Sequence, residues 1–171
     1  MDACVVVGCG NRLRGDDGVG VHVIERLRRV ELPENVQLVD AGTGGMDVFF
    51  LLAGMSRAII VDAVRSGAPP GTVFRVPAEE LAELPAPAAD LHSFRWDHAI
   101  ALGRVLLKDR LPKTIEAYLV EVSSTDVGIG LSKATSAGAD KVIAAICEDL
   151  RRRHHDAQGH DGREGAGRQA S

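Results

Sequence analysis

Two carboxylates and one imidazole stand where an α/β fold would bring them together. Asp17 follows the apolar run ACVVV and a glycine loop, Asp62 ends the run AIIVD, and His92 precedes a long amphipathic stretch. In open α/β sheets, ligands gather beyond the carboxyl ends of the strands, where these side chains would meet. Such a set with an open coordination position suits nickel or zinc, which polarises a carbonyl and lowers the pKa of bound water. Peptide hydrolysis is one reaction that needs this chemistry, so a metal site is one interpretation of the pattern.

Each of these residues also has a purely structural interpretation. Asp16 or Asp17 could be the N-cap of the following helix, and Asp16 is the weaker candidate ligand. His92 could be an ordinary loop or helix-start histidine. Two other histidines are weaker candidates still: His98 shares a helix face with apolar residues, which predicts partial burial, and His22 lies on an amphipathic helix and is predicted to be solvated.

The stretch GCGNRLRGDDGVGV, residues 8–21, begins like a dinucleotide-binding loop but ends in acids. Asp40 even ends the next apolar run, where a ribose-binding acid often lies. However, Leu13 replaces the third glycine of GxGxxG. Asp16 and Asp17 precede the helix at the end whose partial positive charge would receive a pyrophosphate, and two carboxylates there would repel it. A nucleotide-binding oxidoreductase is therefore disfavoured.

Short β-branched runs alternate with helical stretches along the chain. This alternation predicts a mostly parallel sheet with helices on both faces, a three-layer α/β/α fold. The run TVFRVP follows a turn cluster and is predicted to be an antiparallel edge strand. The predicted strands are 3–8, 36–42, 57–64, 72–77 and 114–122, and the predicted helices are 19–30, 45–54, 93–108 and 133–152.

Composition excludes several classes of protein. The net charge of −4, from 20 basic and 24 acidic side chains, argues against a general nucleic-acid or membrane-surface binder. No apolar run approaches the ~18 residues of a membrane helix. The first strand starts almost at Met1, so we expect no signal peptide and a soluble, cytoplasmic protein. The three cysteines form no CxxC pair and are predicted to be buried and reduced, although Cys9 in the glycine loop could be more exposed.

The chain is expected to fold as a single α/β protease domain over residues 1–153, because this length suits one hydrophobic core. From His154 onward the sequence HHDAQGHDGREGAGRQAS has no apolar periodicity. Residues 154–171 are therefore predicted to be a disordered tail.

Four segments together resemble the [NiFe]-hydrogenase maturation proteases. VVVGCGNRLRGDDGVGVHVIERL resembles the family's opening GxGNxLxxD[DE]GxG loop, and DAGTGGMD its second-strand loop. AIIVDAVRSGAPPGTVFRV is similar to its third strand, aspartate and turn, and HSFRWDHAIAL to the histidine segment that opens its long helix. The resemblance covers about residues 5–107, and more loosely extends to 150. It implies a five-stranded, mostly parallel twisted sheet with one antiparallel edge strand, of the phosphorylase/hydrolase-like type.

The resemblance implies an endopeptidase that removes a C-terminal extension from a hydrogenase large-subunit precursor once nickel is inserted. In that family the catalytic, metal-contacting positions fall on Asp17, Asp62 and His92. The nickel is expected to arrive in the substrate, although zinc or cadmium could occupy the site. Asn11 and Asp16 are expected in secondary roles. The loop expected beside the substrate backbone comprises Gly42, Thr43, Gly44 and Gly45.

Departures from the family pattern affect the rim of the expected site. The first-loop acid is aspartate where some members carry glutamate, the segment VEVSSTDVGIGLSKATS lacks the usual proline, and ADL replaces small residues before His92. The sequence also leaves open a non-catalytic nickel-binding or docking protein that checks the large subunit without cutting it. A monomer or weak homodimer is expected.

Overall fold

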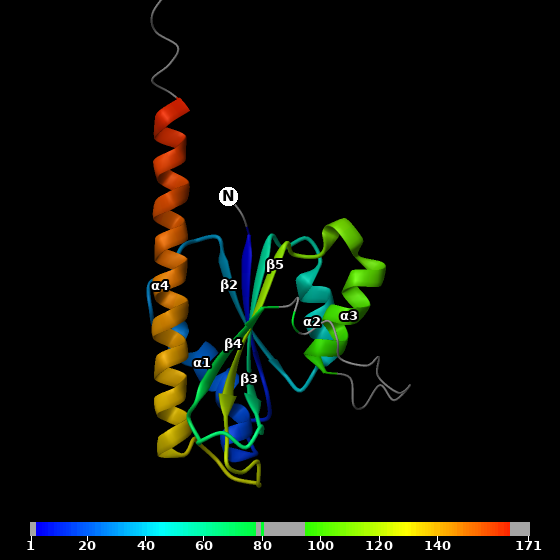
Figure 1. Ribbon diagram of the computed structural model, residues 1–171, viewed down its shortest axis with the longest axis vertical. Coiled ribbons are helices and arrows are strands. Elements are labelled where there is room, and N and C mark those ends of the chain that lie inside the picture. Colours follow the sequence, from blue (N-terminus) through cyan, green and yellow to red (C-terminus); the bar gives the residue numbers. More distant parts are fainter. Residues whose placement is uncertain (1–2, 78–79, 81–94, 165–171) are drawn as a thin grey trace, which may run out of the picture.

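Five strands form the centre of the molecule (Figure 1). The computed structural model describes residues 3–77, 80 and 95–164, with side chains up to residue 156. The order of strands across the sheet is β2-β1-β3-β5-β4. Their bounds are β1 Cys4–Cys9, β2 Val36–Gly42, β3 Arg57–Val64, β4 Val73–Pro77 and β5 Thr114–Glu121.

The sheet is parallel except at one edge. β1 pairs in parallel with β2 and β3, and β3 pairs in parallel with β5. β4 lies at the edge and runs antiparallel to β5, with Val73 opposite Val120. The predicted mostly parallel sheet with an antiparallel edge strand is confirmed, and the predicted second and third strands match β2 and β3 in both bounds.

Helices cover both faces of the sheet and make a three-layer arrangement. α1 and α4 lie on one side of the sheet, and α2 and α3 on the other (Figure 1). The α-helices are α1 Val19–Leu27, α2 Gly45–Leu52, α3 Trp96–Leu106 and α4 Lys133–Glu164, and the short 3-10 helices are η1 Gly15–Gly18 and η4 Lys108–Arg110.

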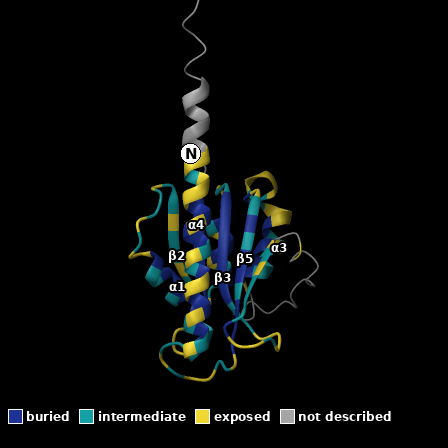
Figure 2. Cartoon of the chain, turned by 60° about the vertical axis from the view of Figure 1, so that its left-hand side comes forward, coloured by how far each residue is buried: buried dark blue, intermediate teal, exposed yellow. Residues whose placement is uncertain are grey.

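The strands separate two apolar cores because successive side chains point to opposite faces. Val6 of β1 and Ile59 of β3 belong to the core under α1 and α4. Val5, Val7 and Ile60 belong to the core under α2 and α3. Figure 2 shows β3 almost entirely buried between the layers, as expected for a central parallel strand whose two faces are both covered.

The last helix is longer than the sequence predicts. α4 begins at Lys133 as predicted but continues to Glu164, whereas the predicted end is Arg152. Residues 154–164, assigned above to a disordered tail, are therefore helical, and that part of the prediction is wrong. Apolar periodicity reports packing against a partner, while a nucleated helix gains one backbone hydrogen bond for each residue added. Periodicity can therefore end before the helix does.

Two predicted segments cannot be compared with the structure. The segment AEELAELPAPAAD, residues 78–90, reads as a weak helical turn followed by a Pro/Ala loop, and it lies outside the described residues apart from Glu80. The predicted start of the long helix at residues 93–94 also lies outside them. The described part of that helix begins at Trp96.

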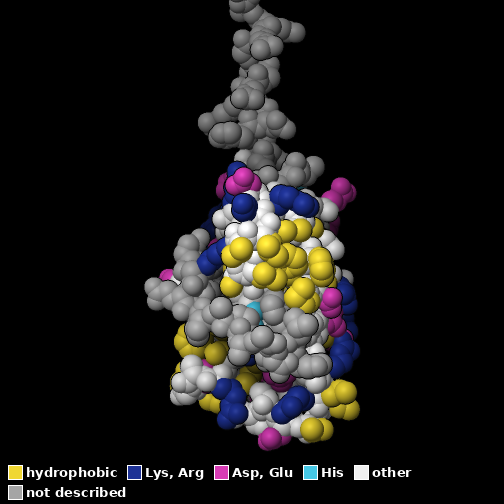
Figure 3. All heavy atoms as spheres, turned by 90° about the vertical axis from the view of Figure 1, so that its right-hand side faces the viewer, with side chains coloured by type: hydrophobic (Ala, Val, Ile, Leu, Met, Phe, Trp, Pro, Cys, Tyr) yellow, Lys and Arg dark blue, Asp and Glu magenta, His cyan; other side chains and the backbone are white. Residues whose placement is uncertain are grey.

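Large apolar side chains are exposed on the layer formed by α2 and α3. Phe50 on α2 and Val105 and Leu106 on α3 are each more than half exposed. Figure 3 views this layer and shows apolar side chains gathered on it. Within residues 3–77, 80 and 95–164, no helix combines the length and apolar character needed to cross a bilayer.

Candidate functional site

The start of α1 lies directly on the sheet, because Gly20 has no side chain. A Cβ at Gly20 would collide with the backbone carbonyl oxygens of Cys9 and Val61. This close approach holds η1, which carries Asp17, beside the carboxyl end of β3, where Asp62 lies. The two carboxylates interact electrostatically: the charge of Asp17 adds to the rise of the Asp62 pKa that burial causes. The expected convergence of these two acids is thus seen in the structure.

Asp17 is held by the glycine loop that precedes it. The backbone N–H of Asn11 donates a 2.9 Å hydrogen bond to Oδ2 of Asp17, and the side-chain oxygen of Asn11 accepts one from the N–H of Leu13, also at 2.9 Å. Asn11 therefore shapes the turn that orients Asp17. The N-cap residue of α1 is Gly18, and no side chain caps that helix, so a capping role for Asp17 is excluded.

Asp16 points to a different partner and is buried, with 6% of its surface exposed. Its Oδ1 accepts a 2.6 Å hydrogen bond from the backbone N–H of Ser132, in the loop that leads into α4. The same two loops also pair through their backbones, because Gly15 donates to Gly128 and Gly128 donates to Leu13. Asp16 thus anchors one loop to the other, and the N-cap role considered for it is wrong.

Asp62 is a buried carboxylate with several hydrogen bonds. Only 8% of the residue is exposed. Its Oδ1 accepts from the N–H of Ala63 at 2.8 Å, and its Oδ2 accepts from the indole Nε1 of Trp96 at 2.8 Å and from Arg95 at 3.4 Å. Burial raises the pKa of Asp62, while the Trp96 and Ala63 hydrogen bonds and the Arg95 charge oppose that rise. A desolvated carboxylate of this kind favours any cation that can reach it.

Cys9 lies near Asp62 but is poorly suited to be a nucleophile. Its side chain is buried, so the greater exposure considered for it is not found. Burial raises the pKa of the Cys9 thiol well above its ordinary value, and the nearby Asp62 charge raises it further. The thiol therefore stays protonated and unreactive at neutral pH.

The glycine-containing loop after β2 lies against the glycine loop after β1. The carbonyl of Gly42 accepts a 2.8 Å hydrogen bond from the N–H of Gly10, and Gly42 adopts a φ of 52° that favours glycine. Thr43 is exposed, while Gly44 is half-buried and Gly45 is buried at the start of α2. Contact between this loop and a substrate stays a prediction.

His92 lies outside the described residues, so its expected place in the site stays a prediction. Arg95, three positions after it in the chain, contacts Asp62. In the described part of the chain, no group of three or more His, Cys, Asp and Glu side chains is arranged to hold a metal ion. The two residues seen together are Asp17 and Asp62, each with carboxylate oxygens suited to a divalent cation.

Comparison with known proteins decides the family. Residues 21–149, well over half of the chain, match the family model HycI, hydrogenase maturation protease. The chain belongs to the hydrogenase maturation protease family. The protease is 32% identical over 155 residues to a protein of Methanocaldococcus jannaschii named as a hydrogenase maturation protease, over 86% of this chain and 96% of that one. It is 30% identical over 149 residues to the hydrogenase 2 maturation protease of Escherichia coli, covering 86% and 90% of the two chains.

The fold is shared with solved members of the family. The hydrogenase maturating endopeptidase HybD of Escherichia coli superposes with a TM-score of 0.75 at 28% identity, covering 88% of this chain and 93% of that one. A hydrogenase maturation protease of Thermococcus kodakarensis, at 23% identity, shows the same fold with a TM-score of 0.68 over 87% and 92% of the two chains.

Sequence reasoning missed two residues of the protease that contact Asp62 and one further buried carboxylate. Trp96 and Arg95 bind Asp62, and Glu121, at the end of β5, is buried. Glu121 accepts hydrogen bonds from the hydroxyl and N–H of Ser66 and from the N–H of Gly67. The Ser66 hydroxyl and these N–H groups lower the Glu121 pKa. The sequence offered two signals for these residues: Trp96 is the single tryptophan, and Glu121 is a carboxylate within the largely apolar run TIEAYLVEV.

Two histidines of the protease can be compared with their predictions. His98 is half-buried, as predicted, and its ring Nδ1 accepts the N–H of Arg95 at the start of α3. His22, predicted to be solvated, is only partly so: 27% of its side chain is exposed. Its Nε2 is buried without a hydrogen-bond partner in the described structure, and its Nδ1 lies 3.6 Å from Glu25.

Proposed function

We propose that this protease removes a C-terminal extension from a [NiFe]-hydrogenase large-subunit precursor after nickel has been inserted. Membership of the hydrogenase maturation protease family supports the reaction class. The observation that carries the proposal is the buried Asp62, hydrogen-bonded on both oxygens and close enough to Asp17 for their charges to interact. Two carboxylates at the carboxyl edge of a parallel sheet favour a substrate that brings a cation.

In this proposal the nickel is part of the substrate, and Asp17, Asp62 and His92 contact it. A carboxylate offers about four lone-pair sites. Among the described residues, the donors to Asp62 are Ala63 on Oδ1, and Trp96 and Arg95 on Oδ2, which leaves one lone pair of Oδ1 for the incoming ion. Among the described hydrogen bonds Asp17 has one donor, from Asn11 to Oδ2, which leaves its Oδ1 for the same purpose.

Trp96 and Arg95 have different roles in this proposal. The Trp96 hydrogen bond is buried and short, so Trp96 fixes the orientation of Asp62. The Arg95 side chain is 59% exposed and its contact with Asp62 is longer, at 3.4 Å. An exposed ion pair of this kind contributes little stability, so Arg95 can leave at small cost when a divalent cation arrives.

The cation would polarise the scissile carbonyl or lower the pKa of an attacking water, and Asp62 could equally accept the proton of that water. Burial raises the pKa of Asp62, which moves its basicity closer to that needed for proton transfer at neutral pH. Burial also excludes bulk water from the carboxylate, which strengthens its interaction with a cation.

A mass measurement tests the proposal directly. A nickel-loaded large-subunit precursor is incubated with the protease, and the intact mass of the precursor is followed. Loss of a discrete C-terminal peptide, dependent on nickel, is expected. His92→Ala should abolish this loss while leaving the fold unchanged by circular dichroism, and the exposed His155→Ala is the matched control that should cleave normally. Full activity of His92→Ala would exclude His92 from the site.

The same measurement separates cleavage from docking. An unchanged precursor mass with a stable complex on gel filtration would favour a non-catalytic protein that binds the nickel-loaded subunit. The two candidate functions share the carboxylates Asp17 and Asp62 but differ in the product, and family membership favours cleavage.

A further inference from the structure

A cavity lies at the opposite end of the parallel strands from Asp62. It has a volume of about 850 Å³ and opens at the amino ends of the parallel strands. One wall is the later part of α4, and another is the segment from η4 to β5. Its volume lies within the range of pockets that hold small organic molecules. The strand-start residues that line it are Cys4, Val36, Arg57 and Thr114.

Arg57 is a buried cation in the lining of this cavity. It is 6% exposed, and its Nη2 donates a 3.1 Å hydrogen bond to Glu116. Its Nη1 forms an ion pair with Asp149, and its Nε lacks a hydrogen-bond acceptor among the described residues. Leaving a buried charged donor unpaired is costly, so this arginine favours an added acceptor.

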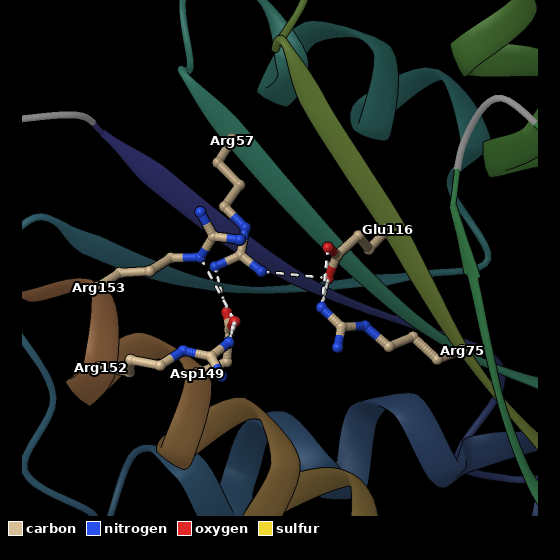
Figure 4. A network of polar contacts seen from close by, with 6 residues as sticks. All are labelled: Arg57, Arg75, Glu116, Asp149, Arg152 and Arg153. Carbon is tan, nitrogen blue, oxygen red and sulfur yellow. Dashed lines mark hydrogen bonds and ion pairs between the residues drawn. The ribbon is translucent and has the colours of Figure 1, made fainter. Parts of the chain in front are cut away.

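The polar network around Arg57 carries more positive than negative charge (Figure 4). Glu116 is shared by Arg57 and Arg75, while Asp149 is shared by Arg57, Arg152 and Arg153. Four guanidinium groups therefore face two carboxylates, an excess of two positive charges in a chain whose net charge is −4. Arginine stays protonated in proteins, so the network cannot remove this excess by losing protons.

The state of Asp149 agrees with this excess of cations. Burial alone would raise the pKa of Asp149, but its contacts with Arg57 and Arg153 together outweigh burial and lower it. Asp149 is therefore already ionised at neutral pH and can compensate no further positive charge.

Two more cations lie on the wall of the cavity. Arg110 and Lys113 are exposed, and neither has an acidic side chain within 4.0 Å in the part of the chain that the structure describes. Asp109 and Asp156 also line the cavity, together with His154. The lining therefore combines a positive excess with apolar surface from Met55, Leu111 and Leu150.

We infer that this cavity binds a small organic anion, a carboxylate or phosphate on a short aliphatic body. The charged head would pair with Arg110 and Lys113 and approach Arg57, and the aliphatic part would contact the apolar lining. None of the described lining residues is Phe, Tyr or Trp, so the cavity lacks the large aromatic side chains that favour a nucleobase. The inference does not depend on the proposed function, because the cavity and Asp62 lie at opposite ends of β3.

Calorimetric titration of the full chain tests this inference. The probes are citrate for a carboxylate and glycerol 3-phosphate for a phosphate, with glycerol as the uncharged control. We expect one of the two anions to bind with a Kd of roughly 100 µM and glycerol to give no heat. The double variant Arg110→Gln with Lys113→Gln should weaken binding roughly tenfold or more, the equivalent of one good charge-assisted contact.

A matched pair of substitutions controls for net charge. Arg29→Gln with Lys141→Gln removes two exposed cations that do not line the cavity, and should leave the Kd unchanged. Equal weakening by both double variants would overturn the inference, because it would show a response to net charge alone. It would also be overturned if neither anion bound at about 10 mM, or if only an acidic peptide did.

Discussion

Trp96 at the start of α3 donates a 2.8 Å hydrogen bond from its indole nitrogen to Oδ2 of Asp62 in β3. Both residues are buried, and they lie 34 positions apart in the chain. Arg95, the neighbour of Trp96, also contacts this carboxylate. The contact joins the start of α3 to the candidate catalytic carboxylate. The position of α3 and the orientation of Asp62 are therefore coupled.

Replacing Trp96 by phenylalanine should impair catalysis more than folding. Trp96→Phe keeps an aromatic ring in the core but removes the N–H, so burial raises the pKa of Asp62 further than in the wild type. A hydrogen bond to a charged group contributes about 1.5–3 kcal/mol, so we expect kcat/KM to fall roughly tenfold or more. The acidic limb of the pH profile of kcat/KM on nickel-loaded precursor should also move to higher pH. An unchanged profile would contradict the positioning role.

Trp96 also reports on ions that reach Asp62, because it is the single tryptophan of the chain. Adding nickel or cadmium to the protease should change its intrinsic fluorescence as the ion approaches the carboxylate beside the indole. Asp62→Asn should abolish this response, while Asp47→Asn, which changes an exposed acid on α2, should retain it. Identical titrations for all three proteins would place the ion elsewhere.

The stability contribution of Asp62 should depend on pH in a defined direction. Burial raises the pKa of Asp62 in the folded chain above 3.8, the ordinary value that it has in the unfolded chain. Between the unfolded-state pKa and the folded-state pKa, the folded chain therefore binds the proton more tightly than the unfolded chain. The free energy of unfolding of wild type relative to Asp62→Asn should therefore fall as pH rises through this window. Urea unfolding at several pH values measures it, and a difference that increases with pH would contradict the burial account.

Removing the Asp16 carboxylate should destabilise the protein without touching the ligand set. Asp16→Ala leaves the N–H of Ser132 without its acceptor, at a cost of about 1–3 kcal/mol. Glu148→Ala, at an exposed position of α4, should change the free energy of unfolding by less than about 0.5 kcal/mol. Urea unfolding compares the two variants, and equal stabilities would show that the Asp16 contact contributes nothing.

A methyl group at Gly20 should be poorly tolerated. Alanine is favoured over glycine inside a helix by about 1 kcal/mol, but the added Cβ would strike the carbonyl oxygens of Cys9 and Val61. Backbone atoms move little, so we expect Gly20→Ala to destabilise by about 3 kcal/mol or more. Gly128→Ala, with its nearest atom 4.0 Å from the added Cβ, should be nearly neutral. A higher melting temperature for Gly20→Ala would refute the close approach.

Local patterns in the sequence were sufficient for much of the fold. The runs that became β2 and β3 are apolar or β-branched segments bounded by turns, so their bounds could be predicted. The place of Asp62 at a strand end followed from the same pattern. The end of α4 could not be predicted, because its later residues are helical without the apolar periodicity that packing on a core requires.

The partners of the site residues were beyond a sequence argument. Asp16 and Asp17 are adjacent and chemically identical, yet one accepts from Ser132 and the other from Asn11. Nothing local distinguishes them, because the first contact spans 116 residues and depends on the path of the loop before α4. The Trp96 contact with Asp62 likewise depends on how α3 packs. The role of His92 stays a prediction from the family resemblance.

The order of strands in the sheet limits how early in its synthesis the chain can complete its fold. β5, made late, lies between β3 and β4, and within the described residues β4 pairs with no strand other than β5. In a nascent chain that ends before Thr114, the edge of β3 is therefore unpaired and β4 has no strand to pair with. Unpaired strand edges of this kind favour aggregation of incomplete chains. The anchor of Asp16 on Ser132 comes later still. Proteolytic competence should consequently appear only after the chain has left the ribosome beyond Ser132.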